Sequence, residues 1–298
     1  MEMGYPKGFR LIFPLAVVFL FIYISFTKLL FFSIADDRLY DCVQDGKPCV
    51  DMQNDVISED ELKLQLKGTP SLKNDTKALE TFMKNCKRQD FQIFKMLAAF
   101  RDSVTEEKEV LLEEYLNGWR ELIKFMDSLG TVFTFISHET MTKINILNGY
   151  LKGENGKSYR TIQSMVKYEL KNNVVNFMEL PRNRVPSGCR TLLRMHRALK
   201  WLEDFLYKLG TSAGKENPSD LCAASYHKTL AHHHSWFIRQ VAEVAFLALP
   251  PLEEMYDIVC VKDHDEAKVV LLTTVDAIVK VYNITQELYV KNSMLDLP

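Results

Sequence analysis

One stretch of the chain, SGCRTLLRMHRALKWLEDFLYKLG (residues 187–210), constrains the fold more than any other. Its apolar residues recur at alternating steps of three and four, and this spacing predicts a core-facing helix. The residues of this apolar stripe are Leu192, Met195, Leu199, Leu202, Leu206 and Leu209. Leu193, Trp201 and Phe205 lie off the stripe, so the helix is apolar on most faces, which is typical of a helix buried between layers.

Three arginines, Arg190, Arg194 and Arg197, occupy the first half of the same helix. Arg190 and Arg194 are four residues apart, so their guanidinium groups leave the helix on one face. A buried arginine needs a partner, because an unpaired buried charge costs several kcal/mol. Two guanidinium forks on one face suit a planar or multi-oxygen anion such as phosphate. The alternative is a solvated basic edge of an amphipathic helix.

The composition of the chain excludes several classes of protein. Its 298 residues, 47% of them hydrophobic, are enough for one large domain or two small ones. The formal net charge of −2 argues against a general nucleic-acid binder. The sequence has no Walker-type or GxGxxG glycine pattern, no CxxC pair and no HExxH motif. We therefore expect no nucleic-acid partner and no cofactor.

Residues 11–34 are predicted to span a membrane. Lys7 and Arg10, in a flank of residues 1–10, precede the apolar run LIFPLAVVFLFIYISFTKLLFF, which is long enough to cross a bilayer as a helix. The tripeptide SIA after the run resembles a cleavage site, so a cleaved signal peptide is the alternative. Because the run is long for a signal peptide, we favour an uncleaved anchor.

Residues 35–86 are predicted to form a linker and residues 87–298 the folded domain. The linker is polar, acidic in places and poor in aromatic residues. Positive charge precedes the apolar run, whereas Asp36, Asp37 and Asp41 follow it. This charge bias favours a luminal or extracellular domain.

Cysteines and glycosylation motifs also bear on the compartment. Cys42 and Cys49 flank a short turn and could pair in an oxidising compartment. Asn74 and Asn283 each begin a glycosylation sequon, a short motif of low specificity. We interpret the remaining cysteines as buried free thiols. They are Cys86, Cys189, Cys222 and Cys260.

The domain is predicted to be almost entirely helical. Two amphipathic helices are expected within residues 91–130, and the last helices over about residues 265–291. A further long helix is expected in SYHKTLAHHHSWFIRQVAEVAFLALP, ended by Pro250 and Pro251. Its expected core-facing residues are Tyr226, Leu230, Phe237, Val241 and Val244.

Three consecutive histidines in that helix, His232, His233 and His234, suggest a metal site, which we reject. Successive helical residues diverge by about 100°, whereas metal-binding pairs usually sit four residues apart on one face. We therefore expect no metal. Instead, one of the histidines should face inward as a hydrogen-bonding group, with the others solvated.

Glu139 and Lys143 form the most informative polar pair. With Ile146, Leu147 and Tyr150 they share one face of a predicted helix, which would place the acid and the lysine within an apolar stripe. This arrangement favours a polar site set in an apolar wall. The alternative is an ordinary surface pair between residues four apart, worth roughly 0.3–0.5 kcal/mol.

Long blocks of the domain resemble the glycolipid transfer protein superfamily, specifically its ceramide-1-phosphate transfer branch. The blocks are EEKEVLLEEYLNGWRELIKFMDSLGTVFTFIS, SGCRTLLRMHRALKWLEDFL, LAHHHSWFIRQVAEVAF and NSMLDLP, and they cover essentially the whole domain. Blocks of this length are far more specific than a short motif. The resemblance implies an all-α, two-layer sandwich of about eight helices that holds one lipid.

The resemblance also implies which residues bind the lipid. The acid that bonds the ceramide amide and a neighbouring hydroxyl falls at Glu139, where members of the branch usually have aspartate. Lys143, Arg190 and Arg194 fall at the phosphate-binding positions, and His234 falls at the histidine that bonds the amide carbonyl. In the glycolipid branch the position of Arg194 holds a tryptophan on which the sugar stacks. Arginine there points to phosphate rather than sugar.

Trp236, two residues after His234, resembles the exposed interfacial tryptophan of the family. Tryptophan prefers the headgroup region of a bilayer, so we expect it to contact membranes. A core tryptophan is the alternative.

The function implied by the resemblance is non-enzymatic transfer of ceramide 1-phosphate between membrane bilayers by a monomeric carrier. An anchored phosphosphingolipid sensor, a lipid hydrolase using Glu139 and His234, and a structural membrane protein are the alternatives. The sequence contains no activated nucleophile to support the hydrolase. Similarity to cytosolic relatives implies a cytosolic domain, against the luminal charge bias.

Overall fold

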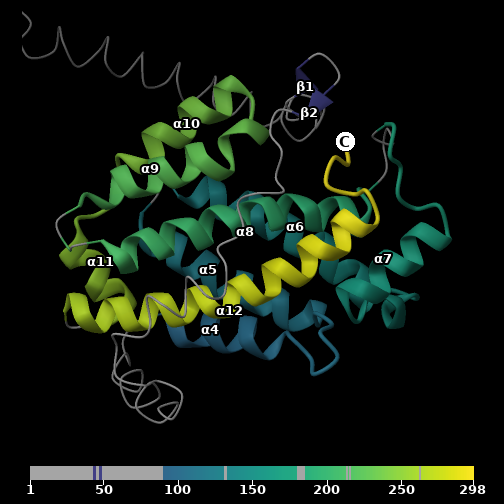
Figure 1. Ribbon diagram of the computed structural model, residues 1–298, viewed down its shortest axis with the longest axis horizontal. Coiled ribbons are helices and arrows are strands. Elements are labelled where there is room, and N and C mark those ends of the chain that lie inside the picture. Colours follow the sequence, from purple (N-terminus) through teal and green to yellow (C-terminus); the bar gives the residue numbers. More distant parts are fainter. Residues whose placement is uncertain are drawn as a thin grey trace, which may run out of the picture. The chain divides into compact units, whose positions relative to one another are not determined.

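The computed structural model describes residues 43–44, 47–48, 90–130, 133–179, 185–212, 214, 216–261 and 263–298. Within these residues the chain is almost wholly helical, with nine α-helices (Figure 1). They are α4 (Ile93–Asp102), α5 (Leu112–Ser128), α6 (Thr134–Lys152), α7 (Ile162–Lys171), α8 (Gly188–Thr211), α9 (Pro218–Thr229), α10 (Trp236–Phe246), α11 (Leu252–Val259) and α12 (His264–Lys291). The expectation of an all-α domain is confirmed, with nine helices in these ranges rather than about eight.

Short elements complete the described part. Two 3-10 helices, η4 (Gly156–Tyr159) and η5 (Ala231–His233), connect longer helices. Two two-residue strands, β1 (Val43–Gln44) and β2 (Lys47–Pro48), pair antiparallel within the stretch predicted as a linker. The predicted anchor lies outside the described residues. Among the helices that are described, none has the length and apolarity needed to span a bilayer.

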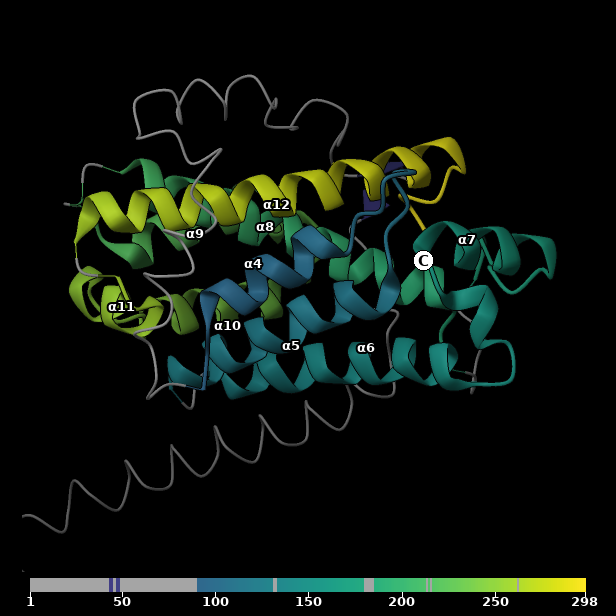
Figure 2. The same ribbon diagram turned by 90° about the horizontal axis from the view of Figure 1, so that it is seen from below.

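Helix α8, the predicted central helix, packs against α12, α9 and α6. In Figure 2, α12 and α8 lie on one side of the helical domain, α5 and α6 on the other, and α4 lies between α12 and α5. All six residues of the predicted apolar stripe of α8 are buried. Ser187 ends the preceding loop, and its hydroxyl oxygen accepts a hydrogen bond from Arg190 N (3.1 Å), as an N-cap should.

A buried carboxylate reinforces this start of α8. Glu169, at the end of α7, accepts hydrogen bonds from Gly188 N (2.7 Å) and Cys189 N (2.9 Å), one on each oxygen. The Tyr159 hydroxyl donates a third bond to it (3.0 Å). Gly188 is needed for this approach, because a Cβ atom there would lie 2.7 Å from Met165 Sδ. A negative charge at a helix N-terminus is also favoured by the helix dipole.

Helices α4 and α5 form where the sequence predicts amphipathic helices. Their apolar faces bury Leu97, Phe100, Leu112, Trp119, Leu122 and Phe125 in the core. Gly118 lets the two helices approach closely, because a Cβ atom at this position would lie 2.8 Å from the Phe100 ring. Helix α12, where the sequence predicts the last helices, likewise buries apolar residues between Leu272 and Tyr282.

The single long helix predicted around the three histidines is wrong. The chain forms α9, the short η5 and then α10, and it is extended at His234 (φ −112°, ψ 143°). Ser235 stops the helix from continuing, because its hydroxyl oxygen accepts a hydrogen bond from Ile238 N and starts α10 afresh. The break shifts the helical register, so Phe237 and Val244 are exposed rather than in the core. The buried residues of α10 are Ala245 and Phe246.

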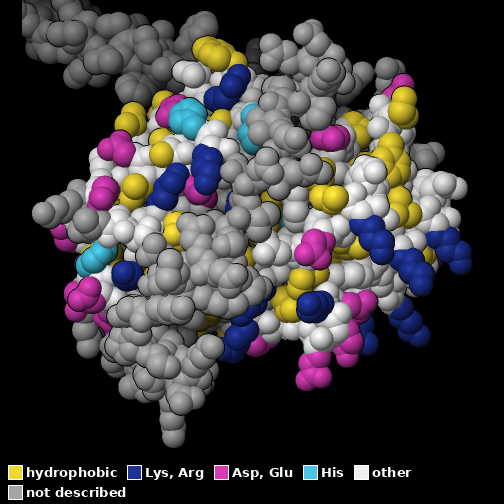
Figure 3. Space-filling view, in the orientation of Figure 1, with side chains coloured by type: hydrophobic (Ala, Val, Ile, Leu, Met, Phe, Trp, Pro, Cys, Tyr) yellow, Lys and Arg dark blue, Asp and Glu magenta, His cyan; other side chains and the backbone are white. Residues whose placement is uncertain are grey.

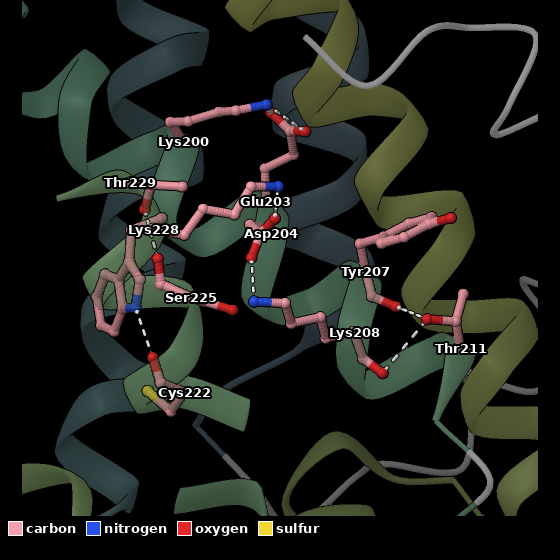
Figure 4. Close-up of polar contacts among 11 residues, drawn as sticks. Lys200, Glu203, Asp204, Tyr207, Lys208, Thr211, Cys222, Ser225, Lys228 and Thr229 are labelled. Atoms are coloured by element: carbon pink, nitrogen blue, oxygen red, sulfur yellow. Dashed lines mark hydrogen bonds and ion pairs between the residues drawn. The ribbon is translucent and has the colours of Figure 1, made fainter. Parts of the chain in front are cut away.

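Polar contacts tie α9 to α8 (Figure 4). The Asp204 carboxylate pairs with Lys208 (2.7 Å) on its own helix and with Lys228 (3.0 Å) on α9. Trp201 Nε1 donates to the carbonyl oxygen of Cys222 (3.4 Å). Beside them lies the nearly fully buried pair of Lys200 Nζ and Glu203 Oε1 (3.0 Å) of α8. These contacts fix α9 and therefore the start of the histidine loop that follows it.

The described cysteines behave in two ways. Cys189 and Cys222 are buried free thiols, as predicted. Cys260, which follows α11, is disulfide-bonded, so its interpretation as a free thiol is wrong. The predicted pairing of Cys42 with Cys49 lies outside the described residues. Asn283 lies within α12, where its side-chain oxygen is buried, so this sequon offers little room for a glycan.

Candidate functional site

The site is built on the arginine face of α8. Arg190, Arg194 and Arg197 follow one another at steps of four and three, so they share one side of the helix. Arg190 is 7% exposed and Arg197 4%, while Arg194 is half-buried. The alternative of a solvated basic edge is therefore wrong for two of the three. Burial of cations without loss of stability requires acceptors, and the structure provides them.

The acceptors come from residues about a hundred positions later in the chain. After α12 ends at Lys291, residues 294–298, here called the return segment, fold back onto α8. Main-chain oxygens at positions 295, 297 and 298 of this segment each accept a hydrogen bond from one of the arginines. The bonds are Arg190 Nε to Pro298 O, Arg194 NH1 to Leu297 O (3.1 Å) and Arg197 NH2 to Leu295 O (2.7 Å).

The return segment is anchored in the core rather than laid over the surface. Met294 and Leu297 are almost completely buried. A guanidinium group has five N–H donors, and each arginine commits at least one of them to this segment. Sequence reasoning missed this role. The apolar residues in the closing NSMLDLP indicate that this segment is buried. The local sequence does not indicate that it packs on α8.

Histidine His234 faces the same region from the loop between η5 and α10. Its Nδ1 lies 2.8 Å from the Tyr226 hydroxyl. Burial, followed by the charges of Lys143 and Arg197, lowers the pKa of His234 to about 4. The imidazole is therefore neutral at physiological pH. Lys143 belongs to α6 and Arg197 to α8, so charges on both helices act on the loop that carries His234.

The neighbouring His233 also responds to the charge of Arg197. Burial and then the charge of Arg197 hold its pKa well below the usual value. The prediction that one histidine faces inward and the others are solvated is wrong, because all three are partly buried. Arg197, which sequence reasoning did not place in the site, acts on both His233 and His234.

Glu139 and Lys143 form an ion pair on α6, but at the edge of its apolar face. The Glu139 side chain is 55% exposed and that of Lys143 23% exposed. The buried residues of α6 are Ser137, Ile144 and Leu147, and of these three Leu147 alone belongs to the predicted stripe. The expectation of a charged pair in the middle of an apolar stripe is therefore wrong. The pair occupies a rim position, with Glu139 more exposed to solvent than Lys143.

An exposed apolar surface begins beside the site. Trp236, the first residue of α10, is 67% exposed, so the alternative of a core tryptophan is wrong. Phe237, Val244 and Leu247 on and just after the same helix are also exposed. In the orientation of Figure 1, hydrophobic, basic and histidine side chains lie close together over the region of α9 and α10 (Figure 3). These four residues are here called the α10 surface. An exposed apolar surface of this kind can contact another apolar surface.

Comparisons with known proteins agree with the all-helical fold of the domain. The family model described as glycolipid transfer protein matches residues 110–261. The ceramide-1-phosphate transfer protein of Danio rerio is 48% identical over 209 residues, which are 70% of this chain and 98% of the relative. The crystal structure of human ceramide-1-phosphate transfer protein in complex with 2:0 ceramide-1-phosphate superposes with a TM-score of 0.67 at 40% identity, covering 70% of this chain and 99% of that one. The apo form of the mouse protein gives 0.66 at 41% identity, covering 70% and 100%.

Proposed function

The chain belongs to the glycolipid transfer protein family, within it to the ceramide-1-phosphate transfer branch, and from this premise we propose that it carries ceramide 1-phosphate between membranes. The observation that carries the proposal is the arginine face of α8. Its three guanidinium groups are each hydrogen-bonded to the return segment. Two of them, those of Arg194 and Arg197, act with Lys143 on the charge state of His234. Such a cluster fits a phosphomonoester, whose oxygens accept charge-assisted hydrogen bonds in the geometry of a guanidinium fork.

The head group, rather than the chains, sets selectivity. Each buried methylene contributes about 0.8 kcal/mol relative to water, so a long acyl chain contributes more than about 10 kcal/mol. The donor bilayer offers the chain a similar apolar environment, and this term hardly distinguishes one lipid from another. Charge-assisted hydrogen bonds to phosphate contribute roughly 1.5–3 kcal/mol each. Arg190, Arg194 and Lys143 would hold the phosphate, with Arg197 orienting the histidines behind it.

Glu139 and His234 would bind the ceramide amide. A partly exposed carboxylate accepts from an amide N–H or hydroxyl without the full desolvation of a buried acid. Its longer side chain, compared with the aspartate usual in the branch, would let it reach inward from the rim of α6. Neutral His234 has one ring N–H to offer to the amide carbonyl.

The proposal is tested by identifying the lipid that purifies with the protein. The relatives are matched over nearly their whole length by 70% of this chain, which supports expression of residues 87–298 alone. We expect mass spectrometry of this domain to find ceramide 1-phosphate. A transfer assay should then show movement between vesicles with no change in the lipid. A new lipid product would support the hydrolase, in which Glu139 and His234 act on bound lipid.

The alternative is a sensor held at one membrane by the predicted anchor of residues 11–34. It binds the same lipid but does not deliver it. Comparing transfer by residues 87–298 with transfer by the full chain separates the two, because only a sensor loses delivery when the anchor is present.

We expect Trp236→Ala to weaken binding to vesicles. The indole lies on the exposed α10 surface, and tryptophan gains free energy at the bilayer interface. The midpoint of urea unfolding should change little, because the side chain makes few core contacts. Trp119→Ala is the control: it removes a buried ring and should lower the unfolding free energy by about 3–5 kcal/mol. Unchanged vesicle binding by Trp236→Ala would remove the α10 surface from the membrane contact.

For the location of the domain we propose the luminal or extracellular side, rather than the cytosolic side implied by family resemblance. The Cys260 disulfide supports this, because disulfides persist in oxidising compartments and are rare in the cytosol. The charge bias around residues 11–34 supports the same orientation.

Glycosylation tests this orientation. We expect full-length protein expressed in animal cells to lose mass on endoglycosidase treatment, and the Asn74→Gln variant to show no such loss. Alkylation before and after reduction should show Cys260 protected until reduction. A wild-type protein that keeps its mass and has a freely reactive Cys260 would place the domain in the cytosol.

A further inference from the structure

We propose that Tyr226 is a positioning residue that fixes His234 in the tautomer whose Nε2 carries the hydrogen, so that Nε2–H donates to the lipid amide carbonyl. The inference rests on the proposed function for the identity of the acceptor. The tautomer itself is a property of the protein without lipid.

The Tyr226 ring is held rigidly. It is 2% exposed, and it packs between the side chains of Trp201 and Phe246, whose ring centroids lie 6.5 Å and 5.3 Å away. Helix α9, which carries it, is tied to α8 through Lys228 and Asp204. The hydroxyl is therefore presented to His234 Nδ1 at 2.8 Å from a fixed direction.

The direction of that hydrogen bond follows from what else surrounds the hydroxyl. Within the described part of the chain, the Tyr226 hydroxyl makes one hydrogen bond, to His234 Nδ1. Burial raises the pKa of Tyr226, so the hydroxyl keeps its proton. If Nδ1 carried the ring hydrogen and donated to the tyrosine oxygen, the hydroxyl hydrogen would be buried without an acceptor, which is unfavourable. Tyr226 O–H therefore donates to Nδ1.

The consequence for His234 is a defined donor. The neutral imidazole has one ring hydrogen, and an Nδ1 that accepts leaves it on Nε2. The other tautomer would present a lone pair to the lipid carbonyl and repel it. At metal sites, a hydrogen bond to one imidazole nitrogen determines the role of the other nitrogen in the same way. Here the same effect operates at a lipid site.

The chain contains a matched pair away from the site. Tyr256 OH lies 2.8 Å from His264 Nδ1, with the same separation of eight residues along the sequence. This pair joins α11 to the start of α12 and has no place in the lipid site. Tyr256→Phe is therefore the control for removing a tyrosine hydroxyl from a histidine.

The experiment uses the purified full-length chain labelled with 15N-histidine and long-range 1H–15N NMR, which distinguishes protonated from unprotonated ring nitrogens. For wild type at neutral pH, we expect His234 Nδ1 to be unprotonated and Nε2 protonated. Tyr226→Phe keeps the ring and should give a mixture of tautomers at His234. Ceramide-1-phosphate transfer by this variant should fall roughly tenfold, with a thermal midpoint close to that of wild type. Tyr256→Phe should change only the signals of His264 and leave transfer unchanged.

The outcomes separate this inference from the proposed function. A protonated Nδ1 in wild type, or unchanged His234 signals in Tyr226→Phe, overturns the inference whatever lipid is carried. A changed tautomer with undiminished transfer overturns the positioning role. Failure of wild type to transfer ceramide 1-phosphate contradicts the proposed function, while the NMR result for the tautomer stands by itself.

Discussion

Replacing Arg194 with leucine is expected to abolish transfer of ceramide 1-phosphate. Arg194 is the half-buried arginine of the α8 face, held by Leu297 O at 3.1 Å, and in the proposed site its guanidinium group binds the phosphate. Each charge-assisted hydrogen bond lost lowers binding roughly 10- to 150-fold, and a guanidinium fork makes two. Leucine also leaves phosphate oxygens without partners in a poorly hydrated site.

Substitutions of the neighbouring cations should reduce transfer by different amounts, depending on how each side chain would bind the phosphate. Arg190→Leu should come close to Arg194→Leu in transfer and also lower stability, because Arg190 is buried and bonded to Pro298 O. Lys143→Ala should have a smaller effect, because an ammonium group is a point charge without a fork.

The assay compares transfer of ceramide 1-phosphate with transfer of a neutral glycosylceramide. Arg101→Leu is the control for loss of an arginine, because Arg101 lies exposed at the end of α4. We expect its transfer to equal that of wild type. If Arg194→Leu also transferred ceramide 1-phosphate as wild type does, Arg194 would have no part in phosphate binding.

A large loss of stability is expected for Glu169→Ala. The substitution leaves Gly188 N, Cys189 N and the Tyr159 hydroxyl buried without their acceptor. Buried donors that lose their partners each cost about 1–3 kcal/mol, and the helix also loses a favourable charge at its N-terminus. We expect the free energy of unfolding to fall by about 3–5 kcal/mol, a large share of the roughly 5–15 kcal/mol typical of a domain.

Urea unfolding of two further variants tests whether the lost hydrogen bonds of Glu169 cause this drop in stability. Glu169→Gln keeps the shape of the side chain but points an amide N–H at a backbone N–H. Its loss of unfolding free energy should therefore lie between those of wild type and Glu169→Ala. Glu106→Ala removes an exposed glutamate and should change the unfolding free energy by less than about 0.5 kcal/mol. A loss below about 1 kcal/mol for Glu169→Ala would show that α8 does not depend on this cap.

Local pattern was enough to predict the helices that carry the site. The stripe of α8 was readable because Leu192, Leu199 and their equivalents repeat with the helical period, and Ser187 begins the helix as a cap should. The arginines were found because three of them share a face. Glu139 and Lys143 were placed on one helix correctly but given the wrong depth, since periodicity does not say which of two adjoining faces is buried.

Contacts between distant parts of the chain could not be predicted in this way. The Arg197–Leu295 bond joins residues 98 positions apart, and the cap of α8 by Glu169 crosses a loop. The break between α9 and α10 was missed because HHHSWF contains no glycine or proline. Its signal was Ser235, a residue that favours helix starts over helix interiors. Once the break is known, the exposure of Trp236 and the partial burial of His234 follow.

The return segment determines when the candidate site is completed during synthesis of the chain. Arg190, Arg194 and Arg197 are made about a hundred residues before the carbonyls that orient them. Contacts of such sequence separation form late, because a long loop must close first. A nascent chain that has completed α8 but not α12 therefore has the cations without their orientation. For the proposed carrier, we therefore expect lipid to be loaded only after this last step of folding.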